Sequence, residues 1–170
     1  MIQTEITQNI KDIVSGFKTI GLDRIFEVLV WIHKNLKLAL NEEYKKEYFR
    51  TRTSEEIIES KKLTGCTDYA LAFLSLIRAS GFEAQYVEAI ENKWLEEEDV
   101  RISGHVFVEV KIGEHWYIVD PQGAAIKAWY GKRYSIYAKG RDSWDIGIVD
   151  LKTLQEKFYT FKKEFNKDRK

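Results

Sequence analysis

Residues 66–80 read CTDYALAFLSLIRAS and form the most apolar stretch of the chain. Only Ser75 interrupts the apolar run between residues 70 and 77, and Gly81 follows as a C-cap. Because a helix that is apolar on nearly every side has to be buried, this stretch predicts a helix in the core. The single cysteine of the chain, Cys66, is the first residue of this helix.

The clearest strand signal lies at residues 105–121, HVFVEVKIGEHWYIVDP. Two runs rich in β-branched and aromatic residues flank Gly113-Glu114, which predicts a hairpin with a two-residue turn. In that register Phe107 opposes Asp120, and both share a sheet face with His105. Diagonal neighbours on one face are roughly 7–8 Å apart, a span that an Asp and a His side chain can bridge with one hydrogen bond. The hairpin therefore predicts contact between His105 and Asp120.

The other segments complete an α+β pattern. Apolar residues at helical spacing, together with capping residues, predict helices at residues 5–18, 22–40, 53–62 and 151–165. Further strands are predicted at residues 82–90, 134–138 and 146–149. The charged residues 41–52 are expected at the surface, and residues 91–103 are expected to form a polar loop.

Length and composition predict one domain, since the chain has 170 residues and 44% hydrophobic content. Its parts are a helical N-terminal layer at residues 1–50, a core at 51–150 and a C-terminal helix at 151–170. The 27 basic and 27 acidic residues balance, which argues against nucleic acid or an anionic membrane as a partner. No apolar run is long enough to span a bilayer and no signal peptide is evident, so the cytoplasm is the expected location.

Cys66 cannot form an internal disulfide, so it is either a small buried side chain or a reactive thiol. At the start of a helix, unpaired backbone N–H groups and the helix dipole favour a thiolate. Burial has the opposite effect, so activation also requires a nearby base or cation. His105 follows a glycine and a long loop and can supply the base, while Asp120 would orient it, which completes a triad.

Other polar residues have weaker signals. His33, inside the second helix, and His115, on the returning strand, are expected to be structural. A metal site of Cys66, His105 and His115 is disfavoured because the two histidines would lie near opposite ends of the hairpin, so no metal is expected. The acidic run at residues 96–99 is expected to be a solvated loop.

Three segments resemble successive motifs of the transglutaminase-like superfamily. They are GCTDYALAFLSLIRASGF, GHVFVEV and WYIVDPQG, at residues 65–82, 104–110 and 116–123. Their order and the spacing of Cys, His and Asp are similar to those of the family, over roughly residues 50–125. The resemblance implies a papain-like α+β core, in which the cysteine helix packs against an antiparallel sheet that carries the His and the Asp.

The resemblance also implies roles: Cys66 as nucleophile, His105 as general base and then acid, and Asp120 as orienting carboxylate. It implies acyl transfer through a thioester, on a peptide or protein substrate or an ester, with no cofactor. Hydrolysis is favoured over cross-linking, because the additional β domains and calcium-binding loops of the large transglutaminases are not evident. The main alternative is a non-enzymatic peptide-binding domain of the same fold. An acyl-carrier-dependent acetyltransferase is disfavoured, because its Arg-Gly-Gly sequence does not precede Cys66.

Substrate contacts are harder to assign from sequence. Papain-type enzymes use an upstream glutamine as an oxyanion donor, but Gln3 and Gln8 are the only glutamines before Cys66 and neither has a suitable position. The backbone N–H of Cys66 can supply one donor. Candidates for the second donor and for substrate contact are Tyr48, Arg50 and Trp94. Trp94, Trp129 and Trp144 are expected to be exposed and are candidates for lining a cleft, and Arg101 and Arg141 are candidates for holding a carboxylate.

Overall fold

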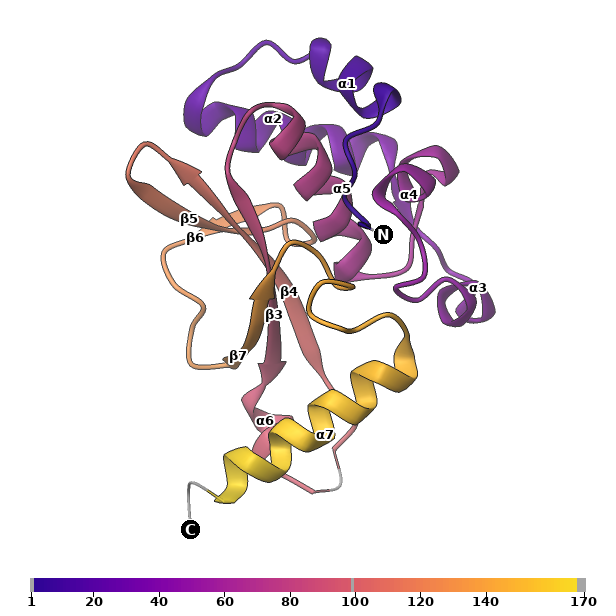
Figure 1. Ribbon diagram of the computed structural model, residues 1–170, viewed down its shortest axis with the longest axis vertical. Coiled ribbons are helices and arrows are strands. Elements are labelled where there is room, and N and C mark those ends of the chain that lie inside the picture. Colours follow the sequence, from indigo (N-terminus) through magenta and orange to yellow (C-terminus); the bar gives the residue numbers. More distant parts are fainter. Residues whose placement is uncertain (1, 99, 168–170) are drawn as a thin grey trace.

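A five-stranded antiparallel sheet lies at the centre of the computed structural model, which describes residues 2–98 and 100–167 (Figure 1). The strands are β3 (Ala84–Glu91), β4 (Gly104–Ile112), β5 (His115–Asp120), β6 (Ala125–Lys127) and β7 (Tyr134–Gly140). Their order in the sheet is β6-β5-β4-β3-β7. The strands β3 to β6 are therefore neighbours in chain order, and β7 returns to pair with the other edge of β3.

The predicted hairpin is confirmed. Ile112 pairs with His115, and the turn between them puts Gly113 at φ +59°, which glycine adopts at little cost. Because side chains alternate along a strand, this register puts Asp120 on the sheet face that carries His105. The local sequence is therefore sufficient to bring the two side chains together.

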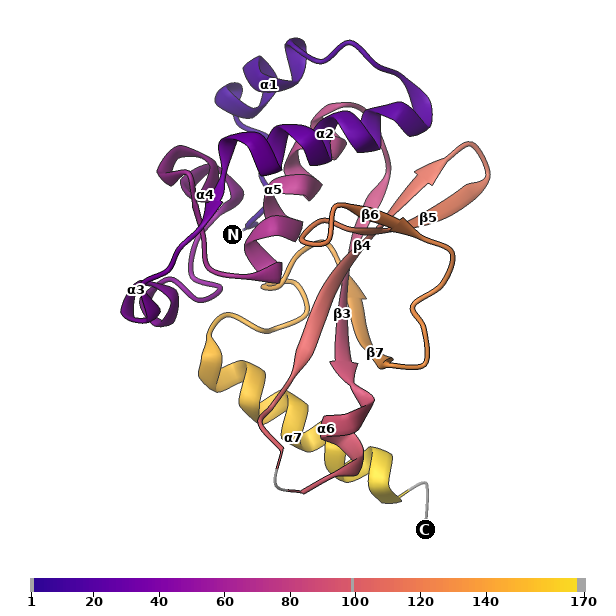
Figure 2. The ribbon, with the colours of Figure 1, turned by 180° about the vertical axis from the view of Figure 1, so that it is seen from behind.

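The predicted core helix is also confirmed, as α5 (Cys66–Ala79), and every residue from 67 to 77 is buried. It packs against α1 (Gln8–Ser15) and α2 (Gly21–Asn35) and against β3 and β4 (Figure 2). Both N-terminal helices are shorter than predicted. The apolar side chains of α5 join those of Tyr86, Val106 and Val108 in one cluster. The helix thus lies between the N-terminal helices and the sheet.

The segment between α2 and α5 differs most from expectation. Its elements are β1 (Lys37–Leu38), α3 (Glu42–Glu47), α4 (Ser54–Ser60) and β2 (Lys62–Leu63). The two short strands pair in parallel, so the predicted second helix ends before them. The start of α4 has the expected cap, a capping box of Thr53 and Glu56. The expected exposure of residues 41–52 is wrong for Arg50 and Arg52, which are buried.

The C-terminal part contains further differences. Residues 146–149 form a turn and irregular backbone rather than the predicted strand, and β6 was not predicted. The expected loop at 91–103 contains a short helix, α6 (Asn92–Glu96). The acidic run within it extends to Asp99, which lies outside the described residues.

The last helix, α7 (Leu151–Lys167), begins where it is predicted. It lies beside α6 at the end of the sheet that is remote from α1 and α2 (Figure 1). The two helices share a second apolar cluster that contains Trp94, Leu154 and Phe158. Within residues 2–98 and 100–167, no helix has both the length and the apolar character needed to cross a membrane.

Candidate active site

Cys66 lies at the N-terminus of α5. The carbonyl of Gly65 accepts the backbone N–H of Asp68 at 3.1 Å, which begins the helical hydrogen bonding, and no side chain caps this end. The cysteine is partly exposed and forms no disulfide. A partly exposed thiol at the start of a helix is accessible to a substrate.

His105, the second residue of β4, lies between Cys66 and Asp120. Its Nε2 is 2.9 Å from Oδ1 of Asp120, and its interaction with the Cys66 side chain contributes to raising the pKa of the imidazole. Because Nε2 faces the carboxylate, Nδ1 is the nitrogen left for the sulfur. Burial lowers the pKa of His105, but the bonds to Asp120 and Cys66 and their charges outweigh burial and raise this pKa from 6.5 to about 9. The protonated imidazolium form of His105 is thus favoured at neutral pH.

Asp120 is held by the turn that follows β5. Its Oδ1 also accepts the backbone N–H of Gly123 at 3.0 Å, and its Oδ2 is 3.7 Å from Nζ of Lys127. Burial raises the pKa of Asp120, but the bonds from His105 and Gly123 and the charge of Lys127 outweigh burial and lower it. A Cβ atom at residue 123 would lie 2.9 Å from Oδ2 of Asp120, so any larger residue there would displace this carboxylate.

Two aromatic rings and a close backbone contact orient His105. Phe107 meets the imidazole edge-on with the ring centroids 4.7 Å apart, and Tyr134 of β7 stacks on it at 5.9 Å. A Cβ atom at Gly104 would lie only 2.6 Å from the carbonyl oxygen of Ala89. The imidazole is therefore fixed by packing as well as by its hydrogen bonds.

A buried ion pair holds the loop on the other side of Cys66. Nη2 of Arg52 is 2.6 Å from Oδ2 of Asp68, in the first turn of α5. The same oxygen accepts the backbone N–H and the hydroxyl of Thr64, at 2.7 and 2.8 Å. The charged side chains are only 6% and 1% exposed. This network fixes the residues that immediately precede Cys66.

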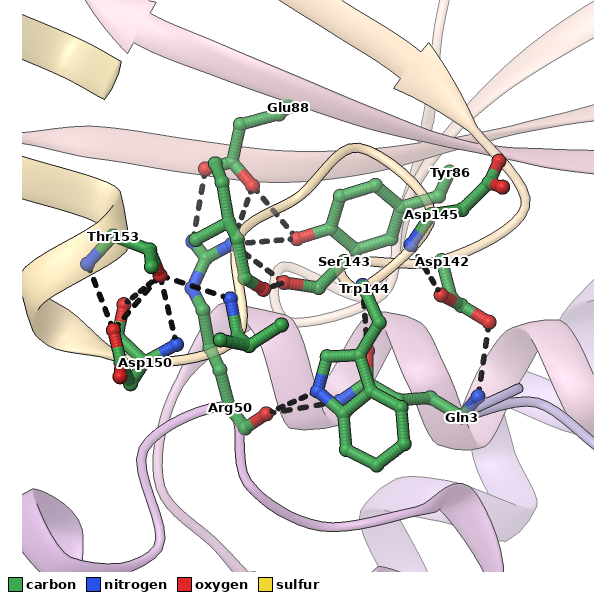
Figure 3. A network of polar contacts seen from close by, with 12 residues as sticks. Gln3, Arg50, Tyr86, Glu88, Asp142, Ser143, Trp144, Asp145, Asp150 and Thr153 are labelled. Carbon is green, nitrogen blue, oxygen red and sulfur yellow. Dashed lines mark hydrogen bonds and ion pairs between the residues drawn. The ribbon is translucent and has the colours of Figure 1, made fainter. Parts of the chain in front are cut away.

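Arg50 forms a second buried ion pair (Figure 3). Its guanidinium donates to both carboxylate oxygens of Glu88, at 2.7 and 2.9 Å, and to the hydroxyls of Tyr86 and Ser143, both at 3.1 Å. Burial lowers the pKa of Arg50, but the Glu88 carboxylate outweighs burial and raises it. Arg50 is therefore a permanent buried charge that Glu88 compensates.

Gln3 holds the backbone that carries this pair. Its side-chain amide donates to the carbonyls of Arg50 and Arg52, at 3.1 and 3.0 Å. The indole N–H of Trp144 donates to the carbonyl of Arg50 at 2.7 Å, and the backbone N–H of Gln3 donates to Asp142 (Figure 3). These bonds support Arg50 at φ 60°, which is uncommon for a residue other than glycine. They also occupy the amide, which leaves Gln3 unsuited to be an oxyanion donor.

A cavity of about 220 Å³ opens beside Cys66. Its lining comes from residues 49–50, residues 64–67 and residues 101–104, together with Glu88 of β3. The N-terminal half of α7 closes it with Leu151, Leu154 and Phe158. Cys66 therefore lies at a concave site built from segments that are far apart in the sequence.

Of the three residues predicted to contact substrate, only Arg50 lines the cavity. Arg50 lines this cavity, but Glu88 engages its guanidinium. Tyr48 packs on Tyr44, with the ring centroids 4.5 Å apart, and is not part of the lining. Trp94 is 1% exposed and packs in the second apolar cluster, so the expectation that it is exposed is wrong.

Other predicted residues lie both at and away from the cavity. Arg101 is exposed and lines it, whereas Arg141 forms an ion pair elsewhere. Trp129 is 60% exposed, and Trp144 bonds to the backbone near the buried ion pairs. His115 begins β5, at the end opposite the triad. In the described part of the chain, no group of three or more His, Cys, Asp or Glu side chains could hold a metal ion.

Sequence reasoning missed three residues around the site. Glu88 and Asp68 are carboxylates within otherwise apolar elements, and this pattern is a recognisable signal because a buried charge needs a partner. His33 was expected to be structural, and it contacts residues close to the site. Its Nε2 donates to the carbonyl of Pro121 at 2.8 Å, and its ring stacks on Tyr69 with the centroids 5.1 Å apart. It therefore ties the turn after β5 to α2 and α5.

Comparison with known proteins defines the class. A model of the transglutaminase-like superfamily matches residues 7–121, so the chain belongs to this superfamily. A solved structure, that of a putative cysteine protease from Cytophaga hutchinsonii, matches with a TM-score of 0.59 and 18% identity, over 82% of this chain and 44% of that chain. The chain thus spans less than half of that protein, and the likeness shows the papain-like fold alone. No curated protein matches.

Proposed function

We propose that this chain is a cysteine-dependent acyl-transfer enzyme that hydrolyses an amide, peptide or ester bond. The observation that carries the proposal is the position of His105, whose Nε2 bonds to Asp120 and whose side chain interacts with Cys66. A nucleophile, a base and an orienting carboxylate in this order suit thiol-based acyl transfer. The superfamily match supports a cysteine-based enzyme at the level of class.

In the first half of the proposed reaction, the Cys66 thiolate attacks the carbonyl carbon and forms a C–S bond, while the C=O electron pair moves to oxygen. The backbone N–H at the start of α5 is suited to donate to that oxyanion. When the intermediate collapses, the protonated His105 gives its proton to the leaving amine or alkoxide. The bond to the leaving group breaks and a thioester remains on Cys66.

In the second half, the neutral His105 takes a proton from water as the water oxygen attacks the thioester. The C–S bond then breaks, which releases a carboxylic acid and restores the thiolate beside the imidazolium. Asp120 holds His105 in the orientation that both steps require and stabilises its positive charge. This reaction requires no cofactor, and a peptide or protein is the proposed substrate.

Trapping of the acyl-enzyme tests the proposal. Folded protein is mixed with p-nitrophenyl acetate, and nitrophenolate release and intact mass are followed together. We expect one acetyl group on Cys66 followed by turnover, and no acetylation of that site in Cys66→Ala. The acylation rate should fall by about 10²–10⁴-fold in His105→Ala, because the acid and base are lost.

The matched control is His115→Ala, which removes a histidine from the other end of the same hairpin and should leave the rate unchanged. The proposal is overturned if Cys66 is acetylated no faster than a free thiol in solution, or if both histidine variants react alike. Either result would favour a peptide-binding domain that retains the fold.

A further inference from the structure

We infer that the cavity beside Cys66 holds the side chain of the acyl group, and that this side chain is apolar, either an aromatic ring or a branched aliphatic group. The inference rests on the proposed function and adds the substrate class to it. It follows from the size, lining, charge and position of the cavity.

The size of the cavity suits one side chain. An apolar cavity of about 150 Å³ holds benzene, so about 220 Å³ accommodates a phenyl ring with a short linker. Pockets for drug-sized ligands begin at about 300 Å³. The cavity is therefore too small for an extended ligand and large enough for an aromatic or branched side chain.

Most of the lining surface of the cavity is apolar. Five apolar side chains contribute to it: Phe49, Ile102, Leu151, Leu154 and Phe158. Leu154 and Phe158 are 7% and 1% exposed, so packing in the second apolar cluster holds this wall in place. An apolar side chain that enters the cavity leaves water and meets preformed apolar contacts, which favours its binding.

The charges at the cavity argue against a cationic side chain. Arg50 and Glu88 compensate each other through two short hydrogen bonds. Arg101 is the remaining charged residue among those that line the cavity in the described chain, and it is exposed. Among the described residues that line the cavity, Glu88 is the one carboxylate and Arg50 already compensates it, so a Lys-like or Arg-like group would find no free counter-ion.

The position of the cavity assigns it to the acyl group rather than to the leaving group. The leaving group receives its proton from His105 and so lies toward that ring. The cavity lining includes Cys66 but not His105, and it extends from the cysteine to α7. A group in this cavity is therefore on the side of the carbonyl that stays bound to sulfur.

Much of the apolar wall comes from α7, which begins at Leu151, beyond the residues 7–121 that match the superfamily. The preference that we infer is thus a property of this chain's C-terminal helix. It is not implied by the conserved chemistry of the triad.

Acylation by two esters tests the inference. The rates of Cys66 acylation by p-nitrophenyl acetate and p-nitrophenyl 3-phenylpropanoate are each divided by the rate with N-acetylcysteine, which removes intrinsic reactivity. We expect the corrected ratio to favour the phenylpropanoate by about tenfold or more, as burial of a phenyl group predicts. In Leu154→Trp, which fills the cavity, the ratio should fall to about one. The control Leu40→Trp adds the same side chain at a position that is 90% exposed and should retain the preference.

A second variant keeps the inference testable if Leu154→Trp does not fold. Leu154→Ala enlarges the cavity and should shift the preference to the longer 5-phenylpentanoate ester. Equal corrected rates for the first two esters in the wild type overturn the inference, as does a ratio that no folded Leu154 variant changes. In both cases the proposed function stands as long as Cys66 is acylated faster than N-acetylcysteine; acylation by every ester at the N-acetylcysteine rate overturns both. A lack of acylation by any ester overturns both.

Discussion

The two flanks of Cys66 are built in different ways. The sheet flank consists of His105 and Asp120, whose side chains are 15% and 11% exposed and come from adjacent strands. The loop flank consists of two ion pairs, Arg50–Glu88 and Arg52–Asp68, whose side chains are between 1% and 6% exposed. These pairs join segments that are far apart in the chain.

This difference suggests separate roles: the sheet flank takes part in the proposed reaction, and the loop flank stabilises the fold. An imidazole with some access to solvent can exchange a proton during a reaction, as acid–base catalysis requires. Removing one partner of a buried ion pair leaves the other charge uncompensated and causes a large loss of stability. Changes in the sheet flank should therefore alter activity and pH dependence, whereas changes in the loop flank should alter the free energy of unfolding.

Breaking the loop flank should have the largest effect on stability. Glu88→Gln leaves Arg50 charged and buried without a counter-ion, which should lower the free energy of unfolding by about 3–5 kcal/mol. Urea unfolding followed by circular dichroism measures this loss. The control is Glu91→Gln in the same strand, which breaks a pair whose partner Arg133 is 67% exposed and should lose less than about 1 kcal/mol. Similar small losses in both variants would contradict the assignment of the loop flank as support.

The free energy of unfolding should fall as the pH rises, because of His105 in the sheet flank. The pKa of His105 is raised from 6.5 to about 9 on folding. Its contribution is therefore fully present below about pH 6.5 and is lost as the pH rises through about 9, with an upper bound of about 3 kcal/mol. Urea unfolding at both pH values should show this loss in the wild type and a smaller one in His105→Gln. Equal losses in the two proteins would place the titrating group elsewhere.

Gly123→Ala should perturb the sheet flank alone. The new Cβ atom would displace the carboxylate of Asp120, because the two would be 2.9 Å apart. A carboxylate that moves can relax into nearby space, so we expect little loss of stability but a kcat/KM that is about 10- to 100-fold lower. The control is Gly113→Asn at the other end of the hairpin, since Asn tolerates positive φ. Equal activity in both variants would mean that the position of Asp120 does not matter.

The smallest effect is expected at His33, which links the turn after β5 to the helices α2 and α5. His33→Phe keeps an aromatic ring against Tyr69 but removes the hydrogen bond to the carbonyl of Pro121. The free energy of unfolding should fall by about 1 kcal/mol, and kcat/KM should fall a few-fold. The control, His115→Phe, alters an exposed residue of the same type. A loss no greater than that of the control would show that His33 contributes nothing to the site.

The contrast between the sheet flank and the loop flank also explains which parts of the site could be predicted from sequence. The sheet flank depends on one hairpin, and a Gly-containing turn together with alternating side chains determines its register. Contact between His105 and Asp120 could therefore be predicted, as could the burial of α5. The family motifs lie in these same segments.

The loop flank could not be predicted, because its contacts depend on how distant segments pack. Arg50 is in a charged stretch that is typical of a surface, and its partner Glu88 is in a strand 38 residues later. Only the fold brings them together with Gln3, near the N-terminus, and Trp144. The cavity wall from α7 was missed for the same reason. The burial of Trp94 was also missed, since amphipathic pattern alone does not show which face of a short helix meets another element.

The most direct test of the central claim is the pH dependence of iodoacetamide labelling at Cys66, in the wild type and in His105→Ala, measured by intact mass. A free thiol has a pKa of about 8.5 and labels slowly at about pH 6. We predict fast labelling of the wild type at that pH, and labelling at least about tenfold slower in the variant, because the imidazolium beside the sulfur is lost. Equally slow labelling of both proteins would contradict a working pair of Cys66 and His105.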